Sequence, residues 1–267
     1  MKMPVIRTGI IGCGNIGEQV AMFLHHHPCF RITTLSDLSI EKAATLRKKF
    51  RRQLPEIVSL EDAFTNNDLL IEAASPVVVQ EILKYKRLDR TKRKILFMSS
   101  GGLIHSLARI SKLKQVEILV PSGAIAGLDA IKAVAEEIES LKLITTKPAH
   151  SLASTPYVVK NKINLDTWKR AQVLFEGGLS EAVEGFPVNI NVAASLFMAS
   201  KFEKIQIQII ADPETKFNTH EIACSGKFGV ITTKTQNLPS RNPKTSQLAI
   251  LSAQRMLINL ASNFHIG

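Results

Sequence analysis

Aromatic residues are scarce in this sequence of 267 residues, because Phe, Trp and Tyr together make up 6%. Binding of nucleic acid uses a basic face with aromatic side chains on which bases stack, or a known binding module. Because neither is present, the net charge of +11 favours a solvated basic surface that attracts anionic metabolites. We therefore expect no nucleic-acid partner.

Cysteines and long apolar runs are also few. The three cysteines, Cys13, Cys29 and Cys224, are odd in number and lack metal-site spacing, which is typical of a reduced cytoplasm. No apolar run approaches the roughly 20 residues that a membrane span needs. The first residues do not combine a charged segment, an apolar stretch and a cleavage site, as a secretory signal does. We expect a cytoplasmic protein that does not bind membranes.

Two further kinds of site are missing from the sequence. No cluster of His, Asp or Glu has the spacing of metal ligands. The G-x-S-x-G turn that presents the serine of many hydrolases is absent as well. The sequence thus argues against metal catalysis and against Ser/His/Asp hydrolysis.

The first part of the chain alternates short apolar runs with longer amphipathic ones. Such alternation, with strands that are apolar on both faces, predicts an α/β unit with a parallel, helix-covered sheet. The expected strands are 5–11, 30–36, 68–74, 94–99 and 116–120, and the expected helices include 15–27, 40–52 and one that Pro76 opens.

The pattern changes after about residue 121 and predicts an α+β domain with an antiparallel sheet. Helices are expected at 128–140, 165–175 and 190–201, and strands at 142–146, 204–211, 220–224 and 228–235. A last helix, 246–259, is expected to pack back on the first domain. We therefore predict a Rossmann domain over 1–122, a catalytic domain over 123–240 and a returning segment over 241–267.

The segment Gly12-Cys13-Gly14-Asn15-Ile16-Gly17 fits the pattern G-x-G-x-x-G. It follows a predicted strand and opens a predicted helix, which is the context in which this pattern binds a dinucleotide. The first glycine makes a tight turn, the second lets the backbone approach the pyrophosphate, and the third allows close packing of the helix. Gly12, Gly14, Asn15, Ile16 and Gly17 are therefore candidate cofactor-binding residues.

Two other strand ends support the same site. Asp37 ends the second predicted strand, twenty positions after Gly17, where an acid accepts hydrogen bonds from the adenosine ribose. An acid there disfavours a 2′-phosphate, so we expect NAD, with NADP as the alternative because basic residues lie nearby. Ala74 and Ser75 end a third strand and are expected to line the cofactor cleft, although Ser75 can equally be a simple helix cap.

Three further segments have no generic explanation. They are residues 120–130 (VPSGAIAGLDA), 186–194 (FPVNINVAA) and 242–246 (NPKTS). Together with the glycine segment, they resemble the L-aspartate dehydrogenase family. Shorter pieces at 145–148, 175–177 and 220–222 occur in the same order as in that family, so that the resemblance covers nearly the whole chain.

The resemblance implies a Rossmann domain closed by the C-terminal helix, with a catalytic α+β domain inserted, in a homodimer. It implies oxidation of L-aspartate by NAD or NADP to iminoaspartate, which hydrolyses to oxaloacetate and ammonia or feeds NAD biosynthesis. By the same resemblance, His220 would be the catalytic residue. Ala124 and one of the two asparagines Asn189 and Asn191 would contact the nicotinamide end of the cofactor.

The chemistry of this reaction suggests further residues. The substrate amine must lose a proton before a hydride can leave Cα, and a base with a pKa near neutrality, such as histidine, serves best. A dicarboxylate also needs cations or hydrogen-bond donors. The candidates are Lys147 and the group Lys244, Thr245 and Ser246, although Thr245 or Ser246 can also be an ordinary helix cap beside a solvated Lys244.

Two alternatives stay open at this point. One is a related NAD(P)-dependent reductase for another amino- or oxo-dicarboxylate, such as a homoserine- or dihydrodipicolinate-type substrate. The other is an NAD-binding redox sensor without turnover, because a fold alone does not establish a function.

Overall fold

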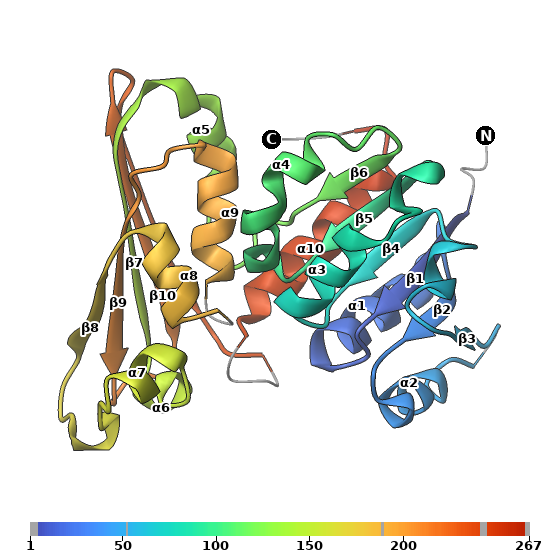
Figure 1. Cartoon of the computed structure of the whole chain (residues 1–267), viewed down its shortest axis with the longest axis horizontal. Coiled ribbons are helices and arrows are strands. Elements are labelled where there is room, and N and C mark those ends of the chain that lie inside the picture. Colours follow the sequence, from blue (N-terminus) through green and yellow to red (C-terminus); the bar gives the residue numbers. More distant parts are fainter. Residues whose placement is uncertain (1–4, 52, 188–189, 241–244, 265–267) are drawn as a thin grey trace. The chain divides into compact units, whose positions relative to one another are not determined.

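A computed structural model of the protein describes residues 5–51, 53–187, 190–240 and 245–264 (Figure 1). The chain folds into two compact units: Met1–Pro121 with Ile250–Ile266, and Ser122–Ala249. Each unit is built on a sheet of its own. The predicted fold class, a Rossmann-type α/β unit with an inserted α+β segment and a returning C-terminal helix, is confirmed.

The first unit contains a six-stranded sheet in the order β3-β2-β1-β4-β5-β6, in which all neighbouring strands run parallel. The strand order reverses between β1 and β4, and ligands of such sheets bind beyond the carboxyl ends of the strands at this point. The strands are β1 (Ile6–Ile11), β2 (Phe30–Ser36), β3 (Glu56–Ile57), β4 (Leu69–Glu72), β5 (Arg93–Phe97) and β6 (Val116–Leu119).

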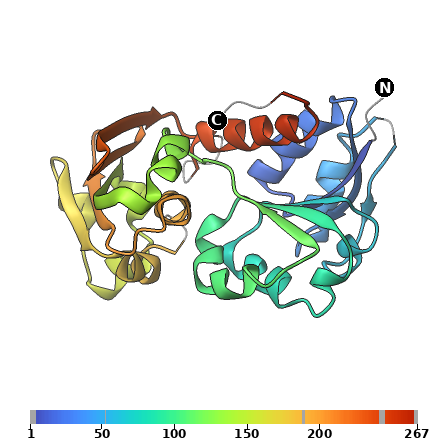
Figure 2. The same cartoon turned by 90° about the horizontal axis from the view of Figure 1, so that it is seen from above.

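Helices cover both faces of this sheet (Figure 2). One face carries α1 (Asn15–His25), α2 (Ile40–Arg47) and α10 (Gln247–Leu260), and the other carries α3 (Pro76–Lys84) and the short α4 (Leu107–Ile110). The last helix belongs to the core of the first unit, because its Ile250, Ala253 and Leu257 are buried in one cluster with Val20 and Leu24 of α1. Over the described ranges, no helix is long and apolar enough to cross a membrane.

The second unit contains a five-stranded sheet in the order β11-β10-β7-β9-β8. The prediction of an antiparallel sheet is wrong for one pair, because β7 and β9 run parallel and the sheet is therefore mixed. A long connection between these two strands allows the parallel pairing. The strands are β7 (Ile138–Pro148), β8 (Gln172–Gly177), β9 (Gln206–Asp212), β10 (Asn218–Gly226) and β11 (Gly229–Asn237).

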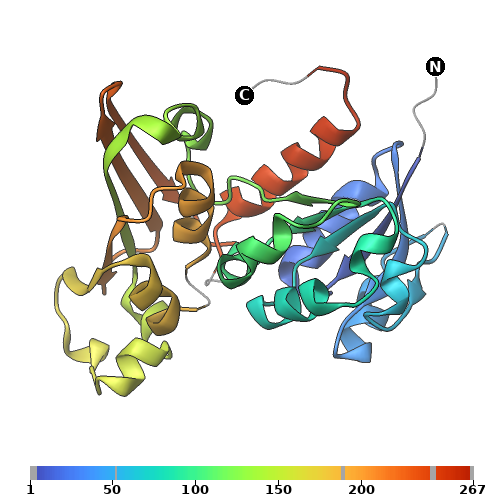
Figure 3. The same ribbon diagram turned by 45° about the horizontal axis from the view of Figure 1, so that its top comes forward.

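Helices pack on one face of this second sheet (Figure 3). They are α6 (Ala149–Leu152), α7 (Pro156–Lys160), α8 (Leu179–Gly185) and α9 (Asn191–Ser200), and α5 (Leu128–Ala133) precedes β7. Two predicted helices are corrected here. The expected helix 128–140 ends at residue 133, and β7 begins at residue 138. The expected helix 165–175 is a single 3-10 turn, Leu165–Thr167, followed by β8.

Candidate active site

The glycine turn after β1 is closely packed at Gly12 and Gly17 and open at Gly14. Gly12 has a φ of +93°, and a Cβ built on it would lie 2.6 Å from the backbone nitrogen of Ala74. A Cβ on Gly17 would lie 1.9 Å from the carbonyl oxygen of Gly12, so the start of α1 packs directly on the turn. A Cβ on Gly14, by contrast, would meet nothing within 4 Å. The backbone at Gly14, at the N-terminus of α1, is therefore open to close approach from outside.

Asp37 connects the end of β2 to this turn. Its Oδ2 accepts a hydrogen bond of 2.7 Å from the backbone N–H of Cys13, and its Oδ1 accepts one of 2.8 Å from the N–H of Ser39. Burial and the carboxylate of Asp37 raise the pKa of the Cys13 thiol to about 12, so this thiol stays protonated. Each oxygen of Asp37 retains a further lone pair, so the carboxylate can still accept bonds from ribose hydroxyls.

Two predicted cofactor residues begin α1. Asn15 is the first residue of the helix, and its side-chain oxygen accepts a hydrogen bond of 3.1 Å from Gln19. Ile16 is partly buried and packs against the core of the first unit. Both residues therefore lie at the helix end where backbone N–H groups point outward.

Glu72, a residue that the sequence reasoning missed, organises the neighbouring strand ends. It is 0% exposed at the end of β4, and its carboxylate accepts bonds of 2.8 to 3.0 Å from the backbone N–H groups of Ala74, Ser75 and Ser99 and from the Ser99 hydroxyl. Burial raises the pKa of Glu72 to about 7, although these hydrogen bonds act in the opposite direction. An acidic residue at the end of an otherwise apolar run was the available signal. Glu72 thus holds the loops after β4 and β5.

Ser75 also caps α3. Its hydroxyl oxygen accepts a hydrogen bond of 3.4 Å from the backbone N–H of Val78, and Pro76 follows it. The helix-cap interpretation of Ser75 therefore holds. Ala74 lies against the glycine turn through the close approach to Gly12. Both residues lie at the carboxyl end of β4, beside the glycine turn that follows β1.

In the second unit, three polar side chains form a row on the covered face of the sheet. Thr145 and Lys147 lie on β7, and His220 lies opposite Thr145 on β10. The Nδ1 atom of His220 is 3.1 Å from the hydroxyl oxygen of Thr145. Sequence reasoning missed Thr145, whose hydroxyl can orient the imidazole ring. Lys147 is 6% exposed and His220 is 2% exposed.

This burial changes the protonation of the row. Burial lowers the pKa of the Lys147 ammonium from 10.5 to about 8. Burial, and then the charge of Lys147, lower the pKa of His220 from 6.5 to about 3. The near-neutral pKa that we expected for this histidine is therefore displaced downward, and the imidazole is neutral at neutral pH. Negative charge placed beside Lys147 would offset its effect and raise the pKa of His220.

The row is covered by α6 and α9. A cavity of about 10 Å³ lies between Thr145, Lys147 and these helices, which is room for a single water. The cover consists of Leu152 of α6 and Val192 and Ala193 of α9.

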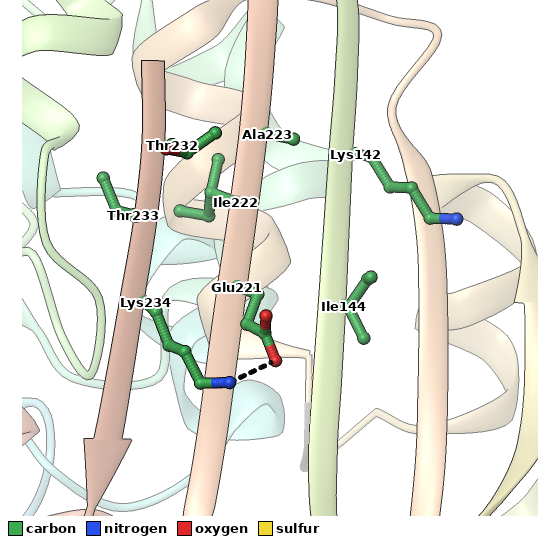
Figure 4. A pocket seen from close by; sticks show the side chains of 8 residues that line it. All are labelled: Lys142, Ile144, Glu221, Ile222, Ala223, Thr232, Thr233 and Lys234. Atoms are coloured by element: carbon green, nitrogen blue, oxygen red, sulfur yellow. Dashed lines mark ion pairs between the residues drawn. The ribbon is translucent and has the colours of Figure 1, made fainter.

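The opposite face of the sheet carries an open hollow of about 390 Å³ (Figure 4). Its polar residues include Glu221 and Lys234, whose carboxylate oxygen and Nζ atom are 3.1 Å apart. This hollow is separate from the row, because side chains of adjacent residues in a strand point to opposite faces.

The remaining predicted residues of the second unit are placed as follows. The carbonyl oxygen of Ala124 accepts bonds of 2.8 Å from the Thr235 hydroxyl and 2.9 Å from the Asn237 amide, so the loop 122–126 is tied to β11. Asn191 is the first residue of α9. Asn189 lies outside the described residues.

The last predicted group precedes α10. Thr245 closes a turn, because its carbonyl oxygen accepts a bond of 2.7 Å from the N–H of Ser240. Ser246 is buried, forms a β-bridge with Pro239 and is followed directly by the helix. Lys244 lies outside the described residues.

The predicted site residues therefore fall into two groups. The glycine turn, Asp37, Ala74 and Ser75 come together in the first unit. In the second unit, Lys147 and His220 come together with Thr145, whereas Ala124 is bound to β11 and the pair Thr245 and Ser246 stands before α10. Among the described residues, no group of three or more His, Cys, Asp or Glu side chains could hold a metal ion.

This architecture is found among dehydrogenases that use a nicotinamide nucleotide. The solved structure of scyllo-inositol dehydrogenase from Lactobacillus casei with NAD(H) matches 98% of this chain and 91% of its own, with a TM-score of 0.55. At 14% identity this likeness shows the fold alone. The first unit and this likeness together define a protein with a Rossmann-type fold.

More similar proteins define the family. A family model described as the C-terminal part of aspartate dehydrogenase matches residues 129–260. L-Aspartate dehydrogenase from Methanosarcina barkeri is 38% identical over 98% of this chain and all of its own, and that from Nitrosopumilus maritimus is 37% identical over 96% and 97%. The crystal structure of aspartate dehydrogenase from Thermotoga maritima covers 98% of this chain and 99% of its own at 25% identity, with a TM-score of 0.72. The chain belongs to the L-aspartate dehydrogenase family, as the sequence motifs indicated.

Proposed function

We propose that the protein oxidises L-aspartate to iminoaspartate with NAD, and that the product hydrolyses to oxaloacetate and ammonia or feeds NAD biosynthesis. The observation that carries the proposal is the buried row of Lys147 beside His220 in a chain of this family. A buried cation suits a substrate with two carboxylates, and a neutral imidazole suits a substrate amine that must lose a proton.

Lys147 and His220 have different roles in this proposal. Lys147 binds a carboxylate of the substrate, and the negative charge thereby brought in raises the pKa of His220. His220 can then accept the proton of the amine through Nε2, provided that its Nδ1–H donates to the hydroxyl of Thr145, 3.1 Å away. A bound nicotinamide nucleotide would supply the chemistry of the oxidation, as the acceptor of the hydride from Cα of the substrate.

The preference for NAD over NADP is proposed from Asp37. The space beside Gly14 and the N-terminus of α1 would hold the pyrophosphate, and Ala74 and Ser75 would line the same edge. A carboxylate at the end of β2 accepts bonds from two ribose hydroxyls but repels a 2′-phosphate. Ala124, with Asn189 or Asn191, is proposed for the nicotinamide end. Thr245, Ser246 and Lys244 are proposed as further groups for the substrate.

We also propose that the protein is a homodimer in the cytoplasm. The support is its membership of the family, together with the three described cysteines, all of which are free thiols. Light scattering coupled to gel filtration measures the oligomeric state directly, and a mass near 29.4 kDa would correspond to a single chain and contradict the dimer.

The test of the function is absorbance at 340 nm with purified protein and NAD or NADP. L-Aspartate is expected to produce NADH, and His220→Ala is expected to lose this activity while it still binds NADH. Other amino- and oxo-dicarboxylates serve as controls. Turnover of one of these, but not of L-aspartate, would point to a related reductase. NADH binding without turnover of any substrate would point to a redox sensor.

A further inference from the structure

Asn218, the first residue of β10, carries a buried amide without a partner. Its side chain is 1% exposed, and neither Nδ2 nor Oδ1 forms a hydrogen bond with any residue that the structure describes. Other buried asparagines of this chain are satisfied: Asn67 donates to Ala63 and Thr34, and Asn237 donates to Ala124. A buried amide with no partner is costly, and in native proteins it calls for an explanation.

The position of Asn218 relates it to the polar row. Side chains on one face of a strand recur at every second residue, so Asn218 shares the covered face with His220. The neighbouring residue Thr219 pairs with Thr146 across the antiparallel strands, which puts Asn218 next in register to Lys147. Along β7, residues 143, 145 and 147 are buried whereas 142, 144 and 146 are partly exposed, and on β10 His220 and Ile222 are buried on the same face, although Thr219 is buried as well. The unpartnered amide therefore lies in line with the two groups proposed for catalysis.

The hydrogen-bonding groups of the amide limit the class of ligand that can bind there. An asparagine offers N–H donors and a carbonyl acceptor, whereas an ammonium such as that of Lys147 offers donors alone. The row as a whole therefore suits a ligand that has both an anionic group and an amine. An α-amino dicarboxylate is such a ligand.

We propose that Asn218 binds the substrate directly: its Nδ2 donates to a carboxylate oxygen, and its Oδ1 accepts an N–H of the substrate amine. This inference rests on the proposed function, because it takes L-aspartate as the ligand. The proposal explains why a buried amide lacks hydrogen-bond partners, because a bound substrate would supply them. Asn218 then selects for substrates that carry an amine, and a site built in this way discriminates strongly against analogues without it.

The test compares Asn218→Leu with the wild type in three measurements: kcat/KM for L-aspartate, the Kd for NADH, and the rise in Tm that L-aspartate causes when NADH is present. Leucine has a similar size and no polar atom. We expect an equal or higher Tm without ligand, an unchanged Kd for NADH, a kcat/KM that is about 10- to 100-fold lower, and loss of the rise in Tm. Thr219→Val, one position along β10 and on the opposite face, is expected to leave all three unchanged.

Other outcomes decide against the proposal. An unchanged kcat/KM and an unchanged rise in Tm in Asn218→Leu overturn it, and so does a loss that is confined to NADH binding, which would assign the amide to the cofactor. If Asn218→Leu does not fold, Asn218→Ser carries the same comparison. If the wild type does not turn over L-aspartate, the proposed function fails, and the rise in Tm still tests binding. No rise in the wild type overturns the present inference as well.

Discussion

Replacing Lys147 by methionine tests whether the buried charge serves function at the expense of stability. Moving the pKa of Lys147 from 10.5 to about 8 corresponds to about 3 kcal/mol of unfavourable free energy when the folded chain holds the ammonium. Below pH 8 the lysine is charged in both the folded and the unfolded chain, so the folded state carries the whole cost. Between pH 8 and 10.5 the unfolded chain holds a proton that the folded chain has released, so the wild type gains stability as the pH rises.

We therefore expect Lys147→Met to be more stable than the wild type by about 3 kcal/mol at pH 7, which is about 6 to 12 °C in Tm. The advantage should shrink above pH 8 and disappear by about pH 10.5. The loss of the ammonium should lower kcat/KM for L-aspartate by about 10- to 100-fold.

Thermal unfolding followed by circular dichroism between pH 6 and 10.5, with initial rates at 340 nm, measures both effects. Lys142→Met is the matched control, because Lys142 lies on the same strand but among the residues of the opposite face (Figure 4). It should leave the stability within about 0.5 kcal/mol and the rates unchanged. A Lys147→Met protein that is less stable than the wild type at pH 7, or that keeps full activity, would refute the reasoning.

Three further predictions concern the first unit. Asp37→Ser should raise the KM for NAD about tenfold and improve the relative use of NADP, as initial rates with the two cofactors will show; an unchanged cofactor ratio contradicts the role of Asp37. Because burial raises the pKa of Glu72 from 4.5 to about 7, its contribution to stability is fully present below pH 4.5 and is lost as the pH rises through 7. Between pH 4.5 and 7, the free energy of unfolding of the wild type, measured in urea, should therefore fall by about 3 kcal/mol relative to that of Glu72→Gln. If the two proteins show the same dependence on pH, the pKa of Glu72 is not raised by burial. Leu257→Ala, at a side chain that is 0% exposed on α10, should lower the free energy of unfolding of the first unit by about 2 to 5 kcal/mol, whereas a loss below about 1 kcal/mol would mean that α10 does not complete this core.

The sequence predicted most of the first unit, because its strands are apolar on both faces and are separated by amphipathic helices. It missed the two-residue strand β3, and the helix expected over 40–52 ends at Arg47. The limits expected for the second strand, 30–36, are those of β2, and Pro76 begins α3 as expected. The glycine turn was also readable, because Gly12 and Gly17 are required by close backbone approaches that follow from the strand–turn–helix context.

The second unit was harder to predict for a physical reason. The segment that becomes β8 is a short apolar run, and periodicity alone does not distinguish such a run from a helix. Its strand conformation depends on pairing with β9, which is distant in the sequence. The parallel pairing of β7 with β9 is likewise a tertiary effect.

Some residues of the candidate site could be identified from the sequence and others only from the structure. His220, Lys147 and Asp37 were identified as candidates from motifs and from the chemistry of the reaction. The roles of Glu72 and Asn218 can be inferred only from the folded structure. The carboxylate of Glu72 accepts four hydrogen bonds, whereas the amide of Asn218 has no partner among the described residues. Burial also displaced the pKa of His220, which no sequence pattern predicts.

The most direct test of the central claim is the fate of the hydrogen on Cα of L-aspartate. Purified protein is supplied with NAD and L-aspartate that carries deuterium at C2, and the reduced cofactor is analysed by mass spectrometry. The proposed chemistry predicts NADH that contains one deuterium and a slower rate than with unlabelled substrate. Reduced cofactor without deuterium, or no reduced cofactor at all, would contradict hydride transfer from L-aspartate.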